Sequence, residues 1–101
     1  AEWDLVNVIC TSGYADDIMT AARKAGASGG TIVNGRGTAK ADDIAFYGST
    51  LVPEKELLMM FVKREQTEKI LASIAQLSCM QKSGSGIAFT FAVQEFIKLG
   101  R

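Results

Sequence analysis

The segment Leu57-Leu-Met-Met-Phe-Val62 constrains the fold most, because its six consecutive apolar residues show no alternation with polar ones. A strand with one face in water alternates, so this run predicts a strand that is covered on both faces. A second run, Leu5–Cys10, is also largely apolar and rich in β-branched residues. We therefore expect two strands that are each covered on both faces.

Other segments carry the signals of helices and further strands. Asp16 and Asp17 fall in the first turn of a segment with apolar residues at helical spacing, and Gly26 follows it as a left-handed stop. Ser12 is a candidate N-cap for this helix. The predicted strands are Trp3–Cys10, Thr31–Arg36, Leu51–Lys63 and Ile87–Val93, and the predicted helices are Ala15–Ala25 and Arg64–Leu77, with a short helical turn over Val93–Leu99.

The order strand, helix, strand, strand, helix, strand predicts an α+β fold. It is typical of the ferredoxin-like βαββαβ sandwich, in which a four-stranded antiparallel sheet carries two helices on one face. The other face would be bare in a single copy, and at ~25 cal/mol per Å² several exposed apolar side chains would forgo several kcal/mol. We therefore predict that this face packs on copies of itself in a closed cyclic oligomer.

Length and composition limit the class of protein. The chain has 101 residues, which suits a single domain over residues 1–101, and 48% of them are apolar, which is enough for a core. The formal net charge is zero, which argues against a general nucleic-acid binder. No apolar run approaches the ~20 residues that span a bilayer, and no signal-peptide pattern opens the chain, so we expect a cytoplasmic protein.

The reactive residue types favour a protein that is neither an enzyme nor a metal-binding protein. Cys10 and Cys79 are far apart in sequence, no CxxC pair is present and histidine is absent, so we predict two buried, reduced thiols and no metal site. No serine or cysteine has an evident base, and the carboxylates show no paired arrangement. We therefore predict no catalytic residue.

Two glycine-containing segments are candidate ligand sites. Gly35-Arg36-Gly37 lies where the second strand leaves for a long loop over residues 38–50, and a glycine loop over residues 82–86 precedes the fourth strand. Small residues at such places let backbone N–H groups converge on a phosphate. A β-bulge explains the glycines of the first segment equally well, and a flexible turn is the more common explanation of the second.

Motifs over nearly the whole chain resemble those of PII signalling proteins, in particular PII-like relatives that diverge from the nitrogen regulatory type. The motifs are Ala22-Arg-Lys-Ala-Gly-Ala-Ser-Gly-Gly-Thr-Ile-Val33, Gly35-x-Gly37, a loop with a tyrosine, Val52-Pro53-Glu-Lys, and Gly84-Ser-Gly86 before Ala88-Phe-Thr-Phe91. The resemblance implies a homotrimer whose sheets face inward. It also implies an adenine nucleotide, as effector and not as covalent cofactor, in clefts between the subunits.

The resemblance assigns roles to individual residues. Gly29–Thr31 match the segment that cups the adenine, Gly35–Gly37 the entry to the family's T-loop beside the phosphates, and Gly84–Gly86 the B-loop that wraps them. Met60 matches an apolar position against the base, and Lys98 a basic residue of the C-terminal segment. The implied nucleotide-binding residues are thus Gly29, Gly30, Thr31, Gly35, Arg36, Gly37, Met60, Gly84, Ser85, Gly86 and Lys98.

The T-loop-like segment, residues 38–50, is expected to be mobile and to contact a target protein, a transporter or an enzyme, through Lys40, Phe46 and Tyr47. Tyr47 falls where nitrogen regulatory proteins carry a tyrosine that is modified by uridylylation, although the surrounding residues differ. The sequence favours instead an aromatic pair, Phe46 and Tyr47, that anchors the loop or docks on a partner.

Departures from the family pattern concern the ligand. Ile87 stands where the B-loop ends in lysine, Leu58 where an acidic residue reads adenine, and Gly100 where a second basic residue is usual. Each lost charge-assisted hydrogen bond removes ~1.5–3 kcal/mol. AMP, ADP or a cyclic dinucleotide needs fewer such contacts than ATP, and a cleft without any ligand is the further alternative.

Three functions therefore stay open. The first is a non-enzymatic trimeric sensor that binds an adenine nucleotide between its subunits and regulates a target protein through the long loop. The second is a structural or adaptor trimer without a ligand. The third is a divalent-cation-responsive trimer similar to the CutA-like relatives of this fold, against which the absence of histidine counts.

Overall fold

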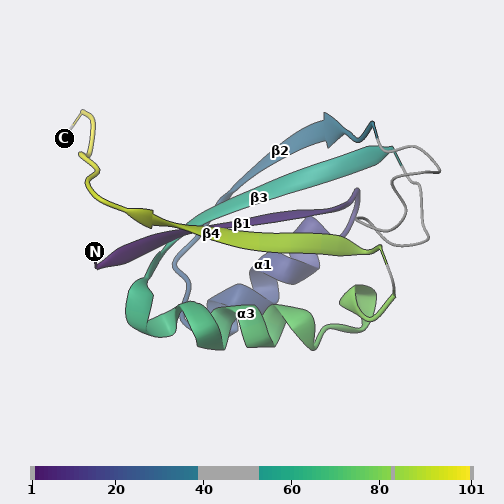
Figure 1. Cartoon of the computed structure of the whole chain (residues 1–101), viewed down its shortest axis with the longest axis horizontal. Coiled ribbons are helices and arrows are strands. Elements are labelled where there is room, and N and C mark those ends of the chain that lie inside the picture. Colours follow the sequence, from purple (N-terminus) through teal and green to yellow (C-terminus); the bar gives the residue numbers. More distant parts are fainter. Residues whose placement is uncertain (1, 39–52, 83, 101) are drawn as a thin grey trace.

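The structure, a computed structural model, describes residues 2–38, 53–82 and 84–100. Figure 1 shows one layer of strands with both α-helices on the same side of it. The fold is the predicted ferredoxin-like α+β sandwich. Its elements in chain order are β1 (Trp3–Thr11), α1 (Ala15–Lys24), β2 (Thr31–Arg36), β3 (Glu54–Lys63), the 3-10 turn η2 (Arg64–Gln66), α3 (Thr67–Ala75), the 3-10 turn η3 (Ser78–Met80) and β4 (Gly86–Val93).

The sheet order is β2-β3-β1-β4, and all three strand pairs are antiparallel. The two apolar runs of the sequence therefore occupy the central strands β1 and β3, as their lack of alternation predicts. The register sets Val6 opposite Met60 on one side and opposite Thr90 on the other. These pairings determine which side chains share a face.

The face that the helices cover is the hydrophobic core of the chain. Alternate residues of β1 and β3 point into it, and they meet Ile18 of α1 and Ile70 of α3. All of these side chains are buried. The β-strand residues of this closed face are Val6, Val8, Cys10, Leu58, Met60 and Val62.

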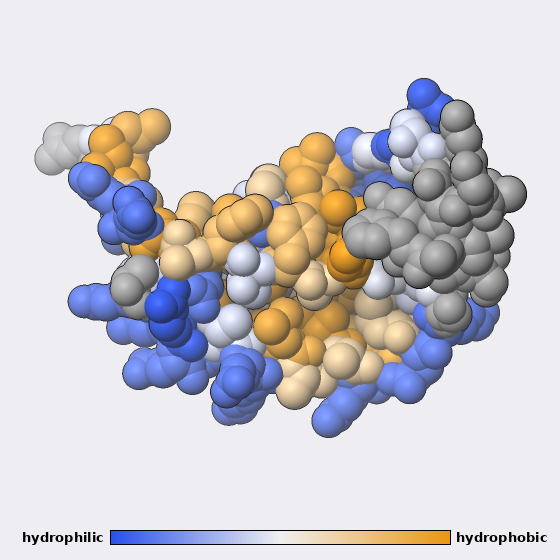
Figure 2. Space-filling model, viewed as in Figure 1, coloured by the Kyte–Doolittle hydropathy of each residue, from blue (hydrophilic) through white to orange (hydrophobic). Residues whose placement is uncertain are grey.

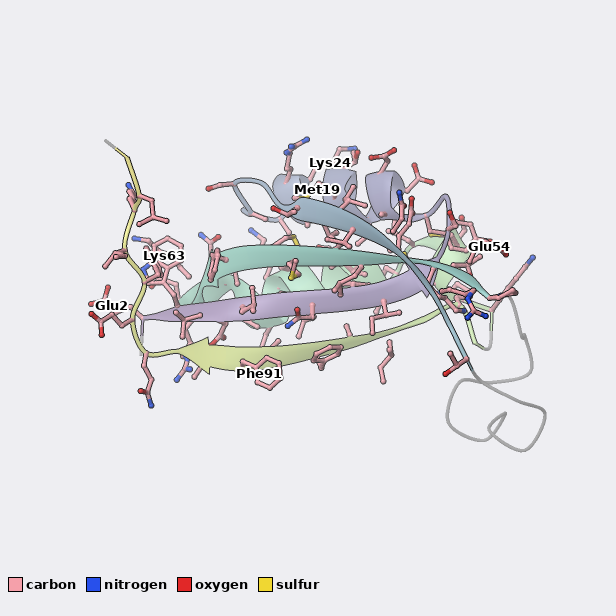
Figure 3. The ribbon with its side chains drawn as sticks, turned by 90° about the horizontal axis from the view of Figure 1, so that it is seen from above. Glu2, Met19, Lys24, Glu54, Lys63 and Phe91 are labelled. Carbon is pink, nitrogen blue, oxygen red and sulfur yellow. The ribbon has the colours of Figure 1, made fainter. Side chains whose placement is uncertain are left out.

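The opposite face carries no helix, and Figure 3 looks down on it. The open face is defined by the alternate residues Leu5, Asn7, Ile9, Val33, Leu57, Met59, Phe61, Phe89 and Phe91. Phe61 is 50% exposed and Phe91 59% exposed. Figure 2, in the view of Figure 1, shows apolar residues across the middle of the molecule, over the strands and between β4 and α3. The bare apolar face that the sequence predicts is confirmed for the single chain.

Helix α1 begins differently from the prediction. Tyr14 is its N-cap residue and makes no capping bond through its side chain, so the proposed Ser12 cap is wrong. Glu56 of β3 caps the helix instead, because its Oε1 accepts from the backbone N–H of Gly13 at 2.9 Å and of Ala15 at 3.0 Å. Gly26 ends the helix with φ +120°, as predicted. Among the described residues, no helix has the length and apolar character to span a membrane.

The chain between β3 and α3 turns around Asp4, which is buried at the start of β1. Arg64 Nη2 donates to Asp4 Oδ1 at 2.9 Å, and Thr67 Oγ1 donates to Asp4 Oδ2 at 2.7 Å. The predicted helix Arg64–Leu77 is therefore divided, with a 3-10 turn before α3 begins at Thr67. The carboxylate holds both pieces at this corner.

Two other element ends also differ from the prediction. Strand β3 begins at Glu54, after Pro53, while Leu51 and Val52 lie outside the described residues. Residues 94–100 form no regular structure, so the helical turn predicted over Val93–Leu99 is wrong. Phe96 packs on Trp3 and on Phe61 instead, with ring centroids 5.6 Å apart in each pair. This aromatic contact replaces local hydrogen bonding as the anchor of the segment.

Candidate functional site

The residues that the sequence singles out fall into two groups at opposite ends of the sheet. Gly35–Gly37 and Gly84–Gly86 lie at the end that carries the long loop, here called the loop end, since Gly35 faces Lys55 and Gly86 faces Cys10. Gly29–Thr31 precede or begin β2 at the other end, and Lys98 lies in the segment that leaves β4 there. One chain does not gather them into one site.

The two loop-end segments are also separated across the sheet. Gly35 lies on β2 and Gly86 on β4, with β3 and β1 between them. Three strand spacings of about 4.8 Å place them roughly 14 Å apart. A single phosphate group therefore does not reach both segments of the same chain.

In the segment Gly35–Gly37, a backbone hydrogen bond holds Gly37, whereas Gly35 and Arg36 are exposed. Gly37 N donates to the carbonyl oxygen of Pro53 at 2.6 Å, which closes the base of the long loop. Arg36 is exposed and forms no ion pair with any described residue. A Cβ added to Gly35 would meet no atom within 4 Å, and its φ is not positive. Neither packing nor backbone conformation therefore requires glycine at position 35.

The segment Gly84–Gly86 is a closed turn. Ser85 donates to the carbonyl oxygen of Lys82 through both its N–H, at 3.2 Å, and its hydroxyl, at 2.6 Å. Gly84 has φ +81°, and a Cβ on Gly86 would lie 2.8 Å from the carbonyl oxygen of Ile9. Turn geometry and packing explain both glycines. A phosphate would have to compete with Lys82 for the donors of Ser85.

At the opposite end, Gly30 and Met60 are packing partners. A Cβ on Gly30 would lie 2.9 Å from Cγ of Met60 and 2.8 Å from the carbonyl oxygen of Met59. Met60 is only 1% exposed and belongs to the core, so its side chain offers no surface to a base in this structure. Thr31 is exposed, and Gly29, like Gly35, has open space around the position of its missing Cβ.

A hollow of about 160 Å³ borders this end of the molecule, next in sequence to Gly29. Trp3 and Phe61 supply aromatic surface, and Lys63 Nζ lies 5.7 Å from the centroid of the Trp3 ring. Flat rings beside a cation suit a planar ligand. Its lining residues are Trp3, Gly26, Ala27, Ser28, Phe61, Val62, Lys63 and Gln66.

Sequence reasoning missed Trp3, Phe61 and Gln66, because it searched glycine motifs and not strand ends. An aromatic residue at the outer end of each central strand is the signal that could have found the first two. Lys98 is exposed in a segment held by Phe96. The predicted loop residues Lys40, Phe46 and Tyr47 lie outside the described residues.

The cysteines divide between interior and surface. Cys10 is fully buried, and burial, together with the negative charge of Glu56, raises the pKa of its thiol to about 11. A thiol with so high a pKa is a poor nucleophile. Cys79 is only half-buried, so the prediction of two buried thiols holds for Cys10 alone. Within residues 2–38, 53–82 and 84–100, no three His, Cys, Asp or Glu side chains cluster as metal ligands would.

Comparison with known proteins supplies the family. No curated protein matches the chain at a significant level. Among solved structures, PII from Arabidopsis thaliana bound to citrate has a TM-score of 0.75 at 21% identity, covering 98% of this chain and 82% of that one. A PII-like signaling protein from Thermus thermophilus has a TM-score of 0.66 at 19% identity, with 90% and 85% covered.

A third structure, CPII from Thiomonas intermedia K12 bound to ADP, AMP and acetate, has a TM-score of 0.65 at 16% identity, with 87% and 82% covered. At such identities these likenesses show the fold. The sequence comparison goes further, since the profile of the family "Nitrogen regulatory protein P-II" matches residues 3–100. The chain therefore belongs to the nitrogen regulatory protein P-II family.

Proposed function

We propose that the protein is a non-enzymatic, cytoplasmic signal-transduction protein that works as a homotrimer. It binds an adenine nucleotide in the clefts between subunits and regulates a target protein through residues 38–50. Membership of the P-II family supports the signalling role. The open face carries the proposal, because an apolar sheet face of this extent is covered by another molecule in proteins that remain soluble.

The separation of the candidate residues supports a site between copies. Arg36 and the Gly84–Gly86 turn lie roughly 14 Å apart in one chain, by the strand spacing. Joining β2 of one copy to β4 of another would bring a cation and a glycine turn to the same phosphate. The missing charges at Ile87 and Gly100 favour AMP, ADP or a cyclic dinucleotide over ATP.

The open space at Gly29 and Gly35 supports a close approach from outside the chain. Neither glycine is needed for packing or for a positive φ, and a missing side chain admits a ligand or a second copy to the backbone. The solved relative from Thiomonas intermedia K12 is bound to ADP and AMP. The hollow beside Trp3 and Phe61 adds aromatic surface near Gly29.

A ligand at Arg36 would act on the long loop at the point where the two ends of that loop meet. Arg36 directly precedes Gly37, whose N–H donates to the carbonyl oxygen of Pro53. This hydrogen bond joins the residues on either side of the segment 38–52. A ligand that binds more tightly to one conformation of these loop ends shifts the conformational equilibrium of the loop by that difference in binding free energy. The target protein would then bind one of these states.

The test combines subunit counting with ligand binding. Native mass spectrometry should report three subunits, and calorimetry should detect at least one of AMP, ADP, ATP and cyclic di-AMP. Gly35→Val should keep the melting temperature, because valine suits an exposed strand, and lower the affinity at least tenfold. Asn34→Val, one residue away on the other face of β2, is the matched control and should bind as the wild type does.

Two outcomes would contradict the proposal in different ways. A monomer would remove the intersubunit cleft altogether. A trimer that binds none of the four nucleotides at millimolar concentration would favour the adaptor function, in which hydrogen exchange of residues 38–50 is the same with and without nucleotide.

A further inference from the structure

Asn7 is a polar side chain at the middle of the open face. It lies on the central strand β1, opposite Met59 of β3 and Phe89 of β4. Leu5 and Ile9 are its neighbours on the same face, two residues away in each direction. The residue is only 5% exposed even in the single chain. An amide therefore sits within a ring of four apolar side chains.

The intrachain contacts use only part of what this amide offers. Asn7 Nδ2 donates to the carbonyl oxygen of Leu5 at 3.3 Å, and no other hydrogen bond joins its side chain to a described residue. An asparagine amide has two donor hydrogens and a carbonyl oxygen that accepts. One donor and the oxygen Oδ1 are thus left for a partner. If apolar groups alone covered the open face, this donor and Oδ1 of Asn7 would lose their hydrogen bonds to water without gaining new partners. That loss costs ~1–3 kcal/mol.

We propose that Asn7 sets the register of the homotrimer, the assembly on which this inference rests. The three copies bring Asn7 to the symmetry axis, where each amide donates to Oδ1 of the next copy and closes a ring of three hydrogen bonds. A second copy suits this position better than an apolar partner, because an amide both donates and accepts and is therefore complementary to itself.

The ring would select one alignment of the subunits. Sliding one copy by two residues along β1 would set Leu5 or Ile9 against an amide of its neighbour and leave that amide unpaired. An apolar face alone gives no such penalty, since one apolar contact resembles the next. A single buried asparagine specifies register and subunit number in coiled coils by the same mechanism, with a loss of stability.

The first variant removes the amide without adding charge. Asn7→Leu should still associate through the enlarged apolar face, but native mass spectrometry should show several subunit numbers where the wild type shows three. Asn34→Leu, on the exposed opposite face of β2, is the matched control and should remain a single species. One well-defined trimer for Asn7→Leu at every concentration would overturn the proposal.

The second variant converts the ring into a charge cluster. Asn7→Asp should raise the concentration for half-dissociation of the trimer at least tenfold at pH 7, because three carboxylates would meet. Association should return below about pH 4, once the carboxyls are protonated. The other titratable side chains on this face of the described strands are Lys55 and Lys63, near its two ends.

The outcomes separate this inference from the function on which it rests. If the wild-type protein is a monomer, the homotrimer and the ring both fail. If it is a trimer and Asn7→Asp dissociates no more readily than Asn34→Asp at pH 7, only the ring fails. Circular dichroism of each variant confirms that a change in subunit number is not a loss of fold.

Discussion

The two faces of the sheet are built from the same four strands but have opposite surroundings. On the closed face, Val8 and Leu58 are almost completely buried under the helices. On the open face, Phe61 and Phe91 keep half or more of their surface exposed. Both faces are apolar, as the lack of alternation in Leu57–Val62 requires. The closed face is completed within one chain, whereas that chain leaves much of the open face uncovered.

The polar groups of the two faces show the same difference. Asp4, on the closed face, has its partners Arg64 and Thr67 in its own chain. Asn7, on the open face, has only the carbonyl oxygen of Leu5 among the described residues. A face that is complete satisfies its buried polar groups internally. The incomplete bonding of Asn7 and the exposed phenylalanines both support the proposal that the open face is a subunit interface.

The largest expected effect tests the closed face. Leu58→Ala should lower the free energy of unfolding by about 2–5 kcal/mol, because it removes a fully buried side chain and leaves a cavity. Ile32→Ala, the exposed neighbour that faces Leu58 across β2 and β3, is the control and should cost clearly less. Urea unfolding followed by circular dichroism measures both, and equal losses would show that β2 is covered in solution.

The next effect tests the open face. Phe91→Asp should leave the circular dichroism spectrum unchanged and shift the protein from trimer to monomer. The reason is that burying one large apolar side chain in the interface stabilises the assembly by about 1.5–3 kcal/mol. Light scattering over a range of concentrations detects the shift. Thr90→Asp, one residue away on the other side of β4, should leave the subunit number unchanged. If the Phe91→Asp variant remains an intact trimer, the open face is not the subunit interface.

The smallest effect tests the polar corner of the closed face. The hydroxyl of Thr67 and then the guanidinium of Arg64 hold the pKa of Asp4 below its ordinary value of 3.8, against the opposing effect of burial. A lowered pKa in the folded state stabilises the protein above pH 3.8, and this contribution disappears as the pH falls through the folded-state pKa. The stability advantage of the wild type over Asp4→Asn should therefore shrink below about pH 4.

Thermal unfolding at pH 7 and at pH 3 measures this change. Thr67→Val should weaken the pH dependence, because it removes the donor with the largest influence on Asp4. A difference between the wild type and Asp4→Asn that stays constant with pH would mean that Asp4 titrates alike in the folded and unfolded chains.

Local patterns predicted the elements well where a period was present. Strand β2 has the predicted bounds, Thr31–Arg36, and Gly26 ends α1 with the expected positive φ. Contacts between distant residues decided the rest. Glu56 caps α1 from 41 residues away, in place of the nearby Ser12. Phe96 packs on Trp3 and Phe61, so the segment after β4 does not form a turn of helix.

The candidate site was predictable in its motifs and not in its geometry. The family pattern named Gly35 and Gly86 together, but the strand order places β1 and β3 between them. Met60 was named as a contact to the base, and its role there stays a prediction, while the structure buries it against Gly30. The hollow beside Trp3 and Phe61 joins residues from the first and third strands, so no local pattern contains it.

The sequence by itself determined that two strands are apolar on both faces and that one of those faces has no helix to cover it. Alternation along a strand is a local property, so it can be read without knowing where the chain goes. Only the tertiary structure decided which face the helices cover, at which glycines the neighbouring atoms leave no room for a Cβ, and which polar groups find hydrogen-bond partners. Those outcomes depend on contacts between residues far apart in the chain, and no local period encodes them.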